Sequence, residues 1–450
     1  MMLWTLAFKN LWRNPRRTIV TGVALATGFA GLSLFNGYVH RIERALAVGS
    51  IYLSHTGHVA IMKKDWIEKG LSKPKNFSLS QAQQNKLQDF LKPYEKDIDF
   101  SAPLFLGVGL ISNGCRSVPF YLTGLPPELK KWIRANPEYN RWTTKSDKTF
   151  LGRSFDAFSR DEMPLMVTEN LARLLNKNSI YTSPASLPPL YLTDCSSIAG
   201  KAQASADPSV QLMTKTLDGG ITAIDANVVG HFTYGFAFLD DMGLQGPLSL
   251  AQKLYDTDAI SRLVLYLRDA KLISEWKKQV LPAFERQFPD LEMIFYDNQR
   301  ISPFYVGTAS FLDSLSFFFV VIAGLAIALA IINSLTINIM ERSKEIGTLR
   351  ALGFNESQMA WLFGREMTLL TLASLVSGIL LTKLLAVLIN RTNIQFEPPG
   401  SSGSIQLEIA LDPRFQFLAF IALSLLVAGM SFWLSKRRIK TNIAHLLIET

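Results

Sequence analysis

The side chains that could do chemistry are few and poorly placed for catalysis. His55 and His58 stand three residues apart, as two metal ligands can, but no third ligand follows at a useful spacing. Asp240 and Asp241 are adjacent acids, a pattern more typical of a turn than of a catalytic pair. The sequence has no GxxxxGK[ST] phosphate loop, no GxSxG nucleophile motif and no HExxH zinc motif. We therefore predict no catalytic, cofactor-binding or metal-binding residue in this chain.

One charged segment has residue types suited to a different task. Residues 341–367 read ERSKEIGTLRALGFNESQMAWLFGREM and lie between two apolar runs. An apolar seam follows the first half, through Ile346, Leu349 and Leu352. Gly353 suits the C-terminal cap of a helix, and Asn355 with Gln358 resembles the capping box of a second one. The segment predicts a helical hairpin, which is either simply solvated or a docking surface for a partner.

Four apolar runs must position this hairpin. They comprise Ile19–Val39, Leu312–Ile339, Met367–Ile389 and Phe415–Ser435. Each holds about twenty residues or more, enough to cross roughly 30 Å of hydrocarbon as a helix. The first run is longer than the apolar core of a usual signal peptide, and no Ala-x-Ala site precedes a mature start. We therefore expect four retained transmembrane helices.

Positive residues set the expected orientation. Lys and Arg gather before the first run, after the second and after the fourth, whereas residues 390–414 contain only Arg391 and Arg414. By the positive-inside rule, both termini and the hairpin face the cytoplasm of a bacterial inner membrane. The predicted organisation is an interfacial helix (1–17), a first span (18–40), a periplasmic domain (41–308), a second span (309–340), the cytoplasmic hairpin (341–364), a third span (365–390), a short periplasmic loop (391–413), a fourth span (414–435) and a cytoplasmic tail (436–450).

Composition agrees with a soluble module inserted into a membrane protein. The 450 residues are 48% hydrophobic and 18% charged, with a mean hydropathy of +0.17, too low for a chain that is membrane throughout. The net charge of +9 lies largely beside the apolar runs, without the aromatic and basic pattern of a nucleic-acid platform. We therefore expect contact with membrane lipids and none with nucleic acid.

The first seventeen residues predict an amphipathic helix lying in the membrane interface. Trp4, Phe8 and Trp12 recur every fourth residue and share one face. Basic residues lie off that face or at its end, at Arg13, Arg16 and Arg17. Aromatic anchoring and attraction to anionic lipid would hold such a helix at the surface, and Pro15 would break it before the first span.

The long insert, residues 41–308, predicts a mixed α/β domain. Candidate strands are His58–Met62, Phe105–Ile111, Pro119–Leu122, Ile221–Phe232, Arg262–Leu267 and Glu292–Phe295, and candidate helices are Ser80–Phe90, Glu162–Leu175 and Lys271–Phe288. Residues 176–220 are rich in Ser, Pro, Thr and Asp, and we expect this stretch to contain a mobile loop. Cys115 and Cys195, the two cysteines, either form one disulfide or remain two thiols.

The two ends of the chain together resemble the FtsX-like permeases, ABC transporter subunits of the MacB and lipoprotein-releasing (LolC/LolE-like) type. The segment LAFKNLWRNPRRTIVTGVALATG is similar to the family's opening, and ERSKEIGTLRALGFNESQMAWLFGRE to its coupling helix. The positions matching the coupling motif are Glu341, Arg342, Glu345, Ile346, Gly347, Arg350, Ala351 and Gly353, with Glu366 opening the third span. HTGHVAIMKKDW after the first span and PPG at 398–400 look like the lipoprotein-releasing branch.

The resemblance implies a function in which the chemistry belongs to a partner. A cytoplasmic ABC ATPase dimer would bind ATP and Mg, and this chain would pass its motion to the periplasmic domain. Expected partners are that ATPase, a second permease copy or paralogue, and a periplasmic adaptor or lipoprotein. Lipoprotein or other lipid-linked cargo is the first expectation, and export of a small amphiphile or peptide the second. The alternative is a non-transporting scaffold that regulates a periplasmic enzyme or sensor.

Overall fold

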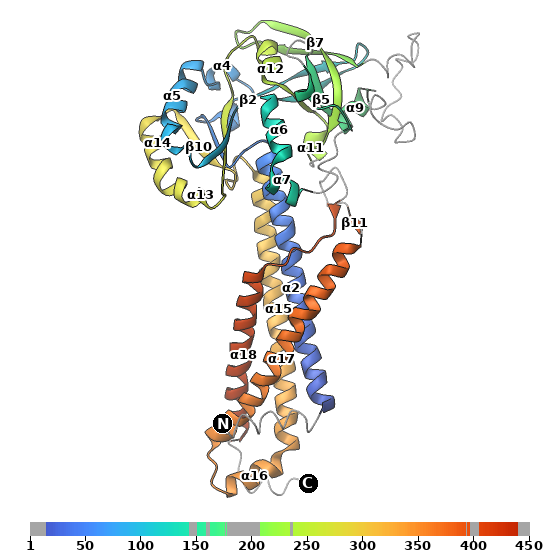
Figure 1. Ribbon diagram of the computed structural model, residues 1–450, viewed down its shortest axis with the longest axis vertical. Coiled ribbons are helices and arrows are strands. Elements are labelled where there is room, and N and C mark those ends of the chain that lie inside the picture. The colour runs from blue at the N-terminus through green and yellow to red at the C-terminus, as the bar shows by residue number, and fades with distance from the viewer. Residues whose placement is uncertain are drawn as a thin grey trace. The chain divides into compact units, whose positions relative to one another are not determined.

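Four long helices dominate the part of the chain that the structure describes. The computed structural model describes residues 15–143, 151–158, 163–175, 177, 208–234, 237–392, 394–396 and 405–439. The long helices are α2 (Pro15–Val48), α15 (Pro303–Glu341), α17 (Glu356–Arg391) and α18 (Pro413–Ile439) (Figure 1). Each contains a window long and apolar enough to cross a membrane. The prediction of four spans is thereby confirmed.

The chain divides into a helical unit and an α/β unit. The helical unit comprises Met1–Glu43, Ala309–Ile394 and Leu407–Thr450, and the α/β unit comprises Arg44–Thr308 with Gln395–Gln406. Both α2 and α15 contribute residues to each unit, because the boundaries at Glu43 and Ala309 fall within these helices. The short hairpin of β11 (Gln395–Phe396) and β12 (Ile405–Gln406) joins α17 to α18.

The core of the helical unit takes apolar side chains from all four long helices. Its buried members are Leu25, Phe29, Ile327, Ile331, Leu335, Met367, Leu370, Leu375, Leu423, Val427 and Leu434. A buried hydrogen bond of 3.0 Å joins Thr21 Oγ1 of α2 to Ser334 Oγ of α15. The residues 407–412 are also tied to α2, through Arg41 Nε on Glu408 Oε2 at 2.8 Å.

Small residues allow close contact between two of the long helices. A side chain at Gly378 of α17 would meet Ala26 and Phe29 of α2, and one at Gly22 would meet Ser374. The alanine and glycine run of α15 behaves differently, since a side chain at Gly324 would meet no heavy atom within 4 Å. The close contact is therefore made between α2 and α17, and the small residues of α15 are not all packed within this chain.

The described residues begin within the predicted interfacial segment. Helix α2, given as Pro15–Val48, includes Arg16 and Arg17, two of the predicted anchors. The predicted boundary of the interfacial helix stays a prediction. The other predicted anchors, Trp4, Phe8, Trp12 and Arg13, lie outside the described residues, as does PPG at 398–400.

The α/β unit is built on one large mixed sheet with the strand order β10-β1-β9-β2-β3-β8-β5-β7-β4, and β6 pairs with β2 and β7. The strands are β1 (Val59–Lys63), β2 (Ile98–Ser112), β3 (Ser117–Leu125), β4 (Leu151–Gly152), β5 (Pro164–Thr168), β6 (Ser209–Lys215), β7 (Ile221–Phe232), β8 (Gly243–Pro247), β9 (Arg262–Leu267) and β10 (Leu291–Phe295). The long strand β2 joins two halves, since it pairs with β9 up to Leu104 and with β3 from Phe105. The mixed α/β prediction is confirmed.

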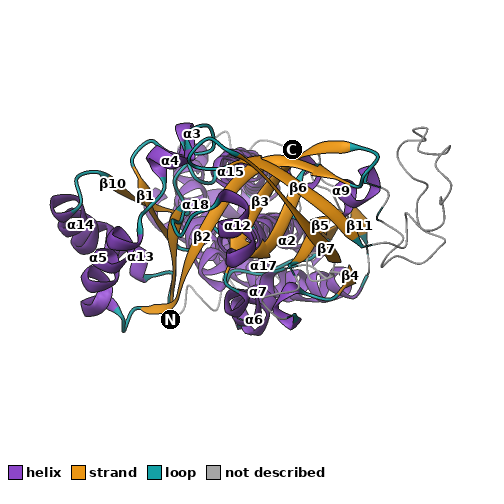
Figure 2. Ribbon diagram, turned by 90° about the horizontal axis from the view of Figure 1, so that it is seen from above, coloured by secondary structure: helices purple, strands orange, loops and turns teal. Residues whose placement is uncertain are grey.

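Helices cover each half of this sheet. They are α3 (Trp66–Lys69), α4 (Pro74–Phe77), α5 (Gln81–Leu91), α6 (Pro127–Ala135), α7 (Pro137–Trp142), α9 (Glu169–Leu174), α11 (Ala237–Asp240), α12 (Leu248–Tyr255), α13 (Leu272–Glu275) and α14 (Leu281–Gln287). Figure 2 shows α5, α13 and α14 gathered beside β1 and β10, while α12 lies over β2 and β3. Helices α13 and α14 are joined through a π-helical turn, Trp276–Val280. The predicted helix over residues 271–288 is therefore present with an irregular centre.

One prediction for this unit is wrong in detail. The predicted helix Glu162–Leu175 is a buried strand, β5, followed by the short helix α9. Tertiary pairing decides this, because β5 lies between β7 and β8 in the sheet and all five of its residues are buried. The stretch 176–220, expected to contain a mobile loop, includes the strand β6 near its end. Residues 178–207 lie outside the described residues, so the expected loop stays a prediction.

The chemically suggestive residues of this unit have structural surroundings. The Asp240 carboxylate accepts hydrogen bonds from Thr233 Oγ1 and the Tyr234 N–H, both at 2.6 Å, at the end of α11. His55 and His58 are buried, and the described residues hold no group of three or more metal-ligating side chains. Cys115 lies between β2 and β3 and takes part in a disulfide. Cys195 lies outside the described residues, so its pairing with Cys115 stays a prediction.

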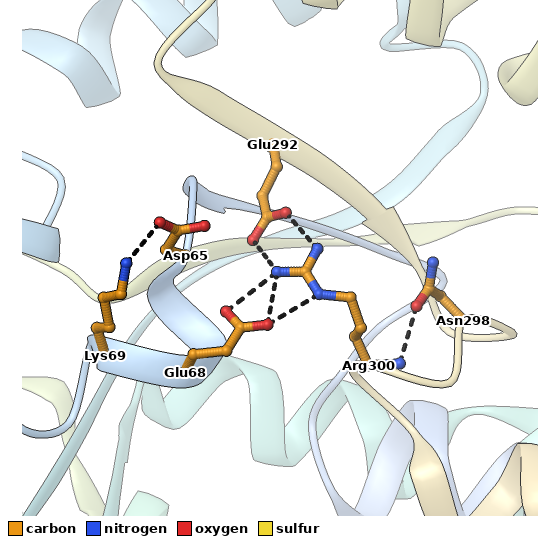
Figure 3. Close-up of polar contacts among 6 residues, drawn as sticks. All are labelled: Asp65, Glu68, Lys69, Glu292, Asn298 and Arg300. Atoms are coloured by element: carbon orange, nitrogen blue, oxygen red, sulfur yellow. Dashed lines mark hydrogen bonds and ion pairs between the residues drawn. The ribbon is translucent and has the colours of Figure 1, made fainter.

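The segment just before α15 is held by one arginine. Figure 3 shows the Arg300 guanidinium between Glu292 of β10 and Glu68 of α3. Arg300 Nη1 lies 2.8 Å from Glu292 Oε2, and its Nε lies 3.0 Å from Glu68 Oε1. The backbone N–H of Arg300 also donates to Asn298 Oδ1 at 2.8 Å. These contacts fasten the approach to α15 onto the rest of the unit.

Candidate coupling site on the short helix α16

The hairpin between α15 and α17 consists of the nine-residue helix α16 (Ser343–Ala351), a turn, and the first turns of α17. Gly353 ends α16 with φ +94°, a left-handed conformation that glycine adopts without strain. The Phe354 N–H donates to the Leu349 carbonyl at 3.1 Å, which satisfies one of the carbonyls at the helix end. The cap predicted at Gly353 is therefore present.

The start of α17 carries the predicted capping box. The Asn355 N–H donates to Gln358 Oε1 at 3.0 Å, and the Gln358 side chain thereby turns back on the residue that precedes the helix. From there α17 runs without a break to Arg391, so the second helix of the hairpin and the third apolar run are one element. A displacement of the turn is consequently a displacement of the end of α17.

An arginine at the root of α16 binds both helices of the hairpin. Arg342 Nε donates to Glu345 Oε2 at 2.9 Å, and its Nη1 donates to Glu366 Oε2 at 3.1 Å. The Glu366 side chain is only 6% exposed and that of Arg342 only 11%, so the pair is shielded from water. Asn338 of α15 donates to the other Glu366 oxygen at 3.4 Å. Charged and polar bonds thus join α15, α16 and α17 at one point.

Apolar packing reinforces the same junction. Ile346 of α16 is buried against Ile339 of α15 and against Met359 and Phe363 of α17. The Arg342 guanidinium also lies over the Phe363 ring, 5.3 Å from its centroid. Gly347 beside Ile346 is buried as well. Two contacts therefore hold α16 against both long helices. One is the charged contact of Arg342, and the other is the apolar contact of Ile346.

The outer side of the hairpin is apolar and exposed. The predicted seam is correct for Ile346 and wrong for Leu352, which is 73% exposed beyond the end of α16. Phe354 and Trp361 are also largely exposed. Leu352 turns outward because Gly353 reverses the chain direction immediately after it. Large apolar side chains left exposed beside charged residues are typical of a protein interaction surface.

The predicted coupling residues divide between the junction and the surface. Arg342, Glu345 and Glu366 come together, and Ile346 and Gly347 pack beneath them. Glu341 ends α15 and is exposed. Arg350 and Ala351 occupy the last turn of α16, but their side chains lie outside the described part of the molecule.

Sequence reasoning missed Asn338 and Phe363, which complete the junction. In the sequence, only their positions pointed to them. Asn338 lies about one helical turn before Glu341, and Phe363 about one turn before Glu366.

Comparisons with known proteins bear on the same region. Residues 317–443 match the family model of the FtsX-like permease C-terminal domain. This range includes part of α15 and the whole of α16, α17 and α18. No curated protein matches the chain significantly. The periplasmic region of MacB from Actinobacillus actinomycetemcomitans is 10% identical, with a TM-score of 0.32 over 53% of this chain and 88% of its own. The extracellular domain of the noncanonic ABC-type transporter YknZ from Gram-positive bacteria is 12% identical, with a TM-score of 0.29 over 52% and 98%.

Proposed function

We propose, from the FtsX-like permease domain that residues 317–443 form, that this chain is the permease subunit of an ABC transporter and receives its motion from a separate ATPase. The family is one of membrane permease components, which accords with four candidate spans in an inner-membrane protein. The observation that carries the proposal is the hairpin at α16. It presents Leu352, Phe354 and Trp361 outward while Arg342 and Ile346 clamp its other side to α15 and α17.

The clamp suggests how force would pass. A partner that pushes on α16 meets a helix joined to α15 and α17 by a shielded ion pair and a packed isoleucine. Close-packed contacts transmit a displacement because they resist compression. Helices α15 and α2 also include residues of the α/β unit, so their displacement would change that unit's position. ATP and Mg would be bound by the partner.

The basic residues support a cytoplasmic position for the hairpin and both termini. Arg16 lies at the start of α2, Lys344 on α16, and Lys436 and Arg437 near the end of α18. All four residues are exposed and lie near a helix end, on the flanks to which the positive-inside rule applies. On this proposal the α/β unit lies on the periplasmic side, and a second permease copy or paralogue completes the membrane part.

The test is co-purification in detergent with a candidate ABC ATPase that is co-expressed with this chain. We expect Leu352→Asp to abolish capture of the ATPase, because a charge would be placed in a desolvated contact. Ile221→Asp is the matched control, since Ile221 is also a largely exposed apolar residue, on β7 of the α/β unit. Undiminished capture of the ATPase by Leu352→Asp contradicts a docking surface at this turn. An equal loss of capture with Ile221→Asp also contradicts it.

For the cargo, lipoprotein or other lipid-linked molecules are our first choice, and a small amphiphile or peptide passed to an adaptor is the second. The support is the resemblance of residues 55–66 to the lipoprotein-releasing branch. A scaffold that regulates a periplasmic enzyme would use the same hairpin. Crosslinking through the α/β unit in cells separates these readings, because recovery of a lipoprotein or adaptor supports transport and recovery of a cell-wall hydrolase supports regulation.

A further inference from the structure

A cavity of about 380 Å³ lies within the α/β unit, where the chain leaves α2 and where it enters α15. Its wall includes Ser54 and Thr56 from the first of these segments and Phe304 from the second. Strand β3 contributes Thr123, and β9 contributes Arg262. The cavity therefore joins elements that are distant in sequence and belongs to none of the contacts at α16.

Arg262 is the unusual member of this wall. It is only 6% exposed, yet no carboxylate pairs with it among the described residues. Its Nη2 donates to the His55 carbonyl at 3.0 Å, and its Nε has no hydrogen-bond partner. Burial lowers the pKa of the guanidinium below its ordinary value, and nearby tyrosines offset this only in part. A buried cation is normally matched by an anion, because water no longer solvates it.

Hydroxyl groups surround this charge. Thr123 Oγ1 and the Tyr234 hydroxyl share one hydrogen bond of 3.0 Å, which uses one O–H and leaves the other to donate elsewhere. Ser50 and Ser302 form a second such pair, at 2.6 Å. A guanidinium together with several hydroxyl donors offers more hydrogen bonds than the two oxygens of a carboxylate can accept. A phosphate group, with more oxygens in a tetrahedral arrangement, suits this set of donors better.

The remaining wall is apolar and adjoins a candidate span. Phe304 is partly exposed at the start of α15, close to Leu239 and Ile301 on the same cavity. The apolar run of α15 begins at Leu312, about 12 Å farther along the helix at 1.5 Å per residue. Phospholipid phosphates lie just outside the hydrocarbon layer, and their distance from its edge is smaller than this rise along α15. The cavity thus combines an unpaired cation, hydroxyl donors and an apolar side.

We propose that this cavity binds a phosphate group, with Arg262 as its counter-ion. The source of the phosphate is either a membrane phospholipid or free phosphate, and the chemistry of recognition is the same for both. The proposal concerns ligand binding in the α/β unit and does not depend on coupling to an ATPase.

The experiment measures thermal unfolding of the full chain in an uncharged detergent that lacks phosphate. The probes are inorganic phosphate, a short-chain phosphatidylglycerol, and a short-chain diacylglycerol that lacks the phosphate. Ligand that binds the folded state raises the unfolding midpoint with concentration. We expect a saturable rise with phosphatidylglycerol and none with diacylglycerol. A rise of the same size with inorganic phosphate identifies free phosphate as sufficient.

Variants separate a binding role from a structural one. We expect Arg262→Gln to weaken the apparent affinity by about 10- to 100-fold, as loss of a charge-assisted contact does. Arg268→Gln is the matched control, because Arg268 directly follows β9 but does not line the cavity. If Arg262→Gln lowers the midpoint but shows the wild-type rise with ligand, Arg262 only holds the His55 turn and the proposal is overturned.

A second variant covers the case in which Arg262→Gln does not fold. Tyr234→Phe removes one hydroxyl from the cavity and leaves the arginine in place. We expect it to weaken phosphatidylglycerol binding several-fold without changing the response to diacylglycerol. No midpoint rise with either phosphate probe in the wild-type protein also overturns the proposal.

Discussion

The guanidinium of Arg342 donates a hydrogen bond of 3.1 Å to the buried carboxylate of Glu366, which lies 24 residues farther along the chain. This single contact links the end of α15 to the interior of α17 and encloses α16 between them. Because it is shielded from water, its two charges depend on each other far more than those of a surface pair do.

Breaking this pair from one side should destabilise the protein strongly. We expect Glu366→Gln to lower the free energy of unfolding by about 3–5 kcal/mol, because Arg342 would keep a buried charge without its counter-ion. The double variant Arg342→Met with Glu366→Met should recover much of that loss. Thermal unfolding in detergent measures both. Equal destabilisation by the single and double variants would contradict a coupled pair, and Lys92→Ala, at an exposed pair, should leave the midpoint unchanged.

The cap at Gly353 offers a test of the hairpin's geometry. We expect Gly353→Ala to cost about 1 kcal/mol, because alanine is strained at φ +94°. The effect would come from the backbone alone, since a side chain there meets no atom within 4 Å. Gly353→Asn should cost less because asparagine tolerates this conformation. Gly324→Ala, in a helix with equally open surroundings, should not destabilise the protein.

The contact between α2 and α17 should not tolerate a larger residue. A Cβ atom at Gly378 would lie 3.0 Å from the Ala26 carbonyl oxygen and 3.1 Å from Phe29 Cδ1. We expect Gly378→Leu to lower the free energy of unfolding by about 1–3 kcal/mol, since the two helices would have to separate. Gly429→Leu on α18 is the control, because a Cβ atom there would meet no heavy atom of another described element within 4 Å. Similar unfolding midpoints for the two variants would show that α2 and α17 are not closely packed.

Buried histidines should make the α/β unit sensitive to acid. Burial lowers the pKa of His58 to about 4, and its Nδ1 accepts the Leu267 N–H at 3.0 Å. Between pH 6.5 and 4 the unfolded chain therefore binds a proton that the folded chain does not, so stability falls as pH falls. We expect a loss of about 2 kcal/mol from this residue between pH 7 and pH 5. The measurement is the free energy of unfolding against pH.

The control for this titration keeps the hydrogen bond and removes the imidazole. His58→Asn places an amide oxygen near the position of Nδ1, so the Leu267 N–H retains an acceptor. The pH dependence of this variant should be shallower by about one proton. His231, whose pKa burial also lowers to about 4, should continue to contribute in that variant. An unchanged slope would mean that His58 is protonated alike in the folded and unfolded states.

The sequence predicted those elements whose side chains all point to one answer. Strands Ile221–Phe232 and Arg262–Leu267 have the predicted bounds, because β-branched and aromatic residues run through them and turn residues flank them. The cap at Gly353 followed from the glycine itself. The four spans followed from the length of uncharged apolar sequence, which few other structures can bury.

What the sequence could not predict depends on partners far along the chain. The five residues of β5 are too short a run for periodicity to separate a strand from a buried helix, and its place between β7 and β8 decides between them. The Arg342–Glu366 contact requires the hairpin to fold back, which motif spacing alone does not reveal. In the sequence, Arg262 is simply the first residue of a predicted strand. Only the fold shows that this arginine is buried and that its described neighbours include no carboxylate.

The strand β2 constrains how this protein can be divided or rearranged. It supplies Ile98–Leu104 to one half of the sheet and Phe105–Ser112 to the other, with no loop between the two stretches. A cut or an insertion near Leu104 would therefore leave each half of the sheet with an incomplete strand, and neither half could fold by itself. A fused tag or a transferred loop is therefore better placed in a turn that interrupts no strand. Evolutionary exchange of one half without the other would likewise have to occur at the turns, because the halves share a single unbroken backbone segment.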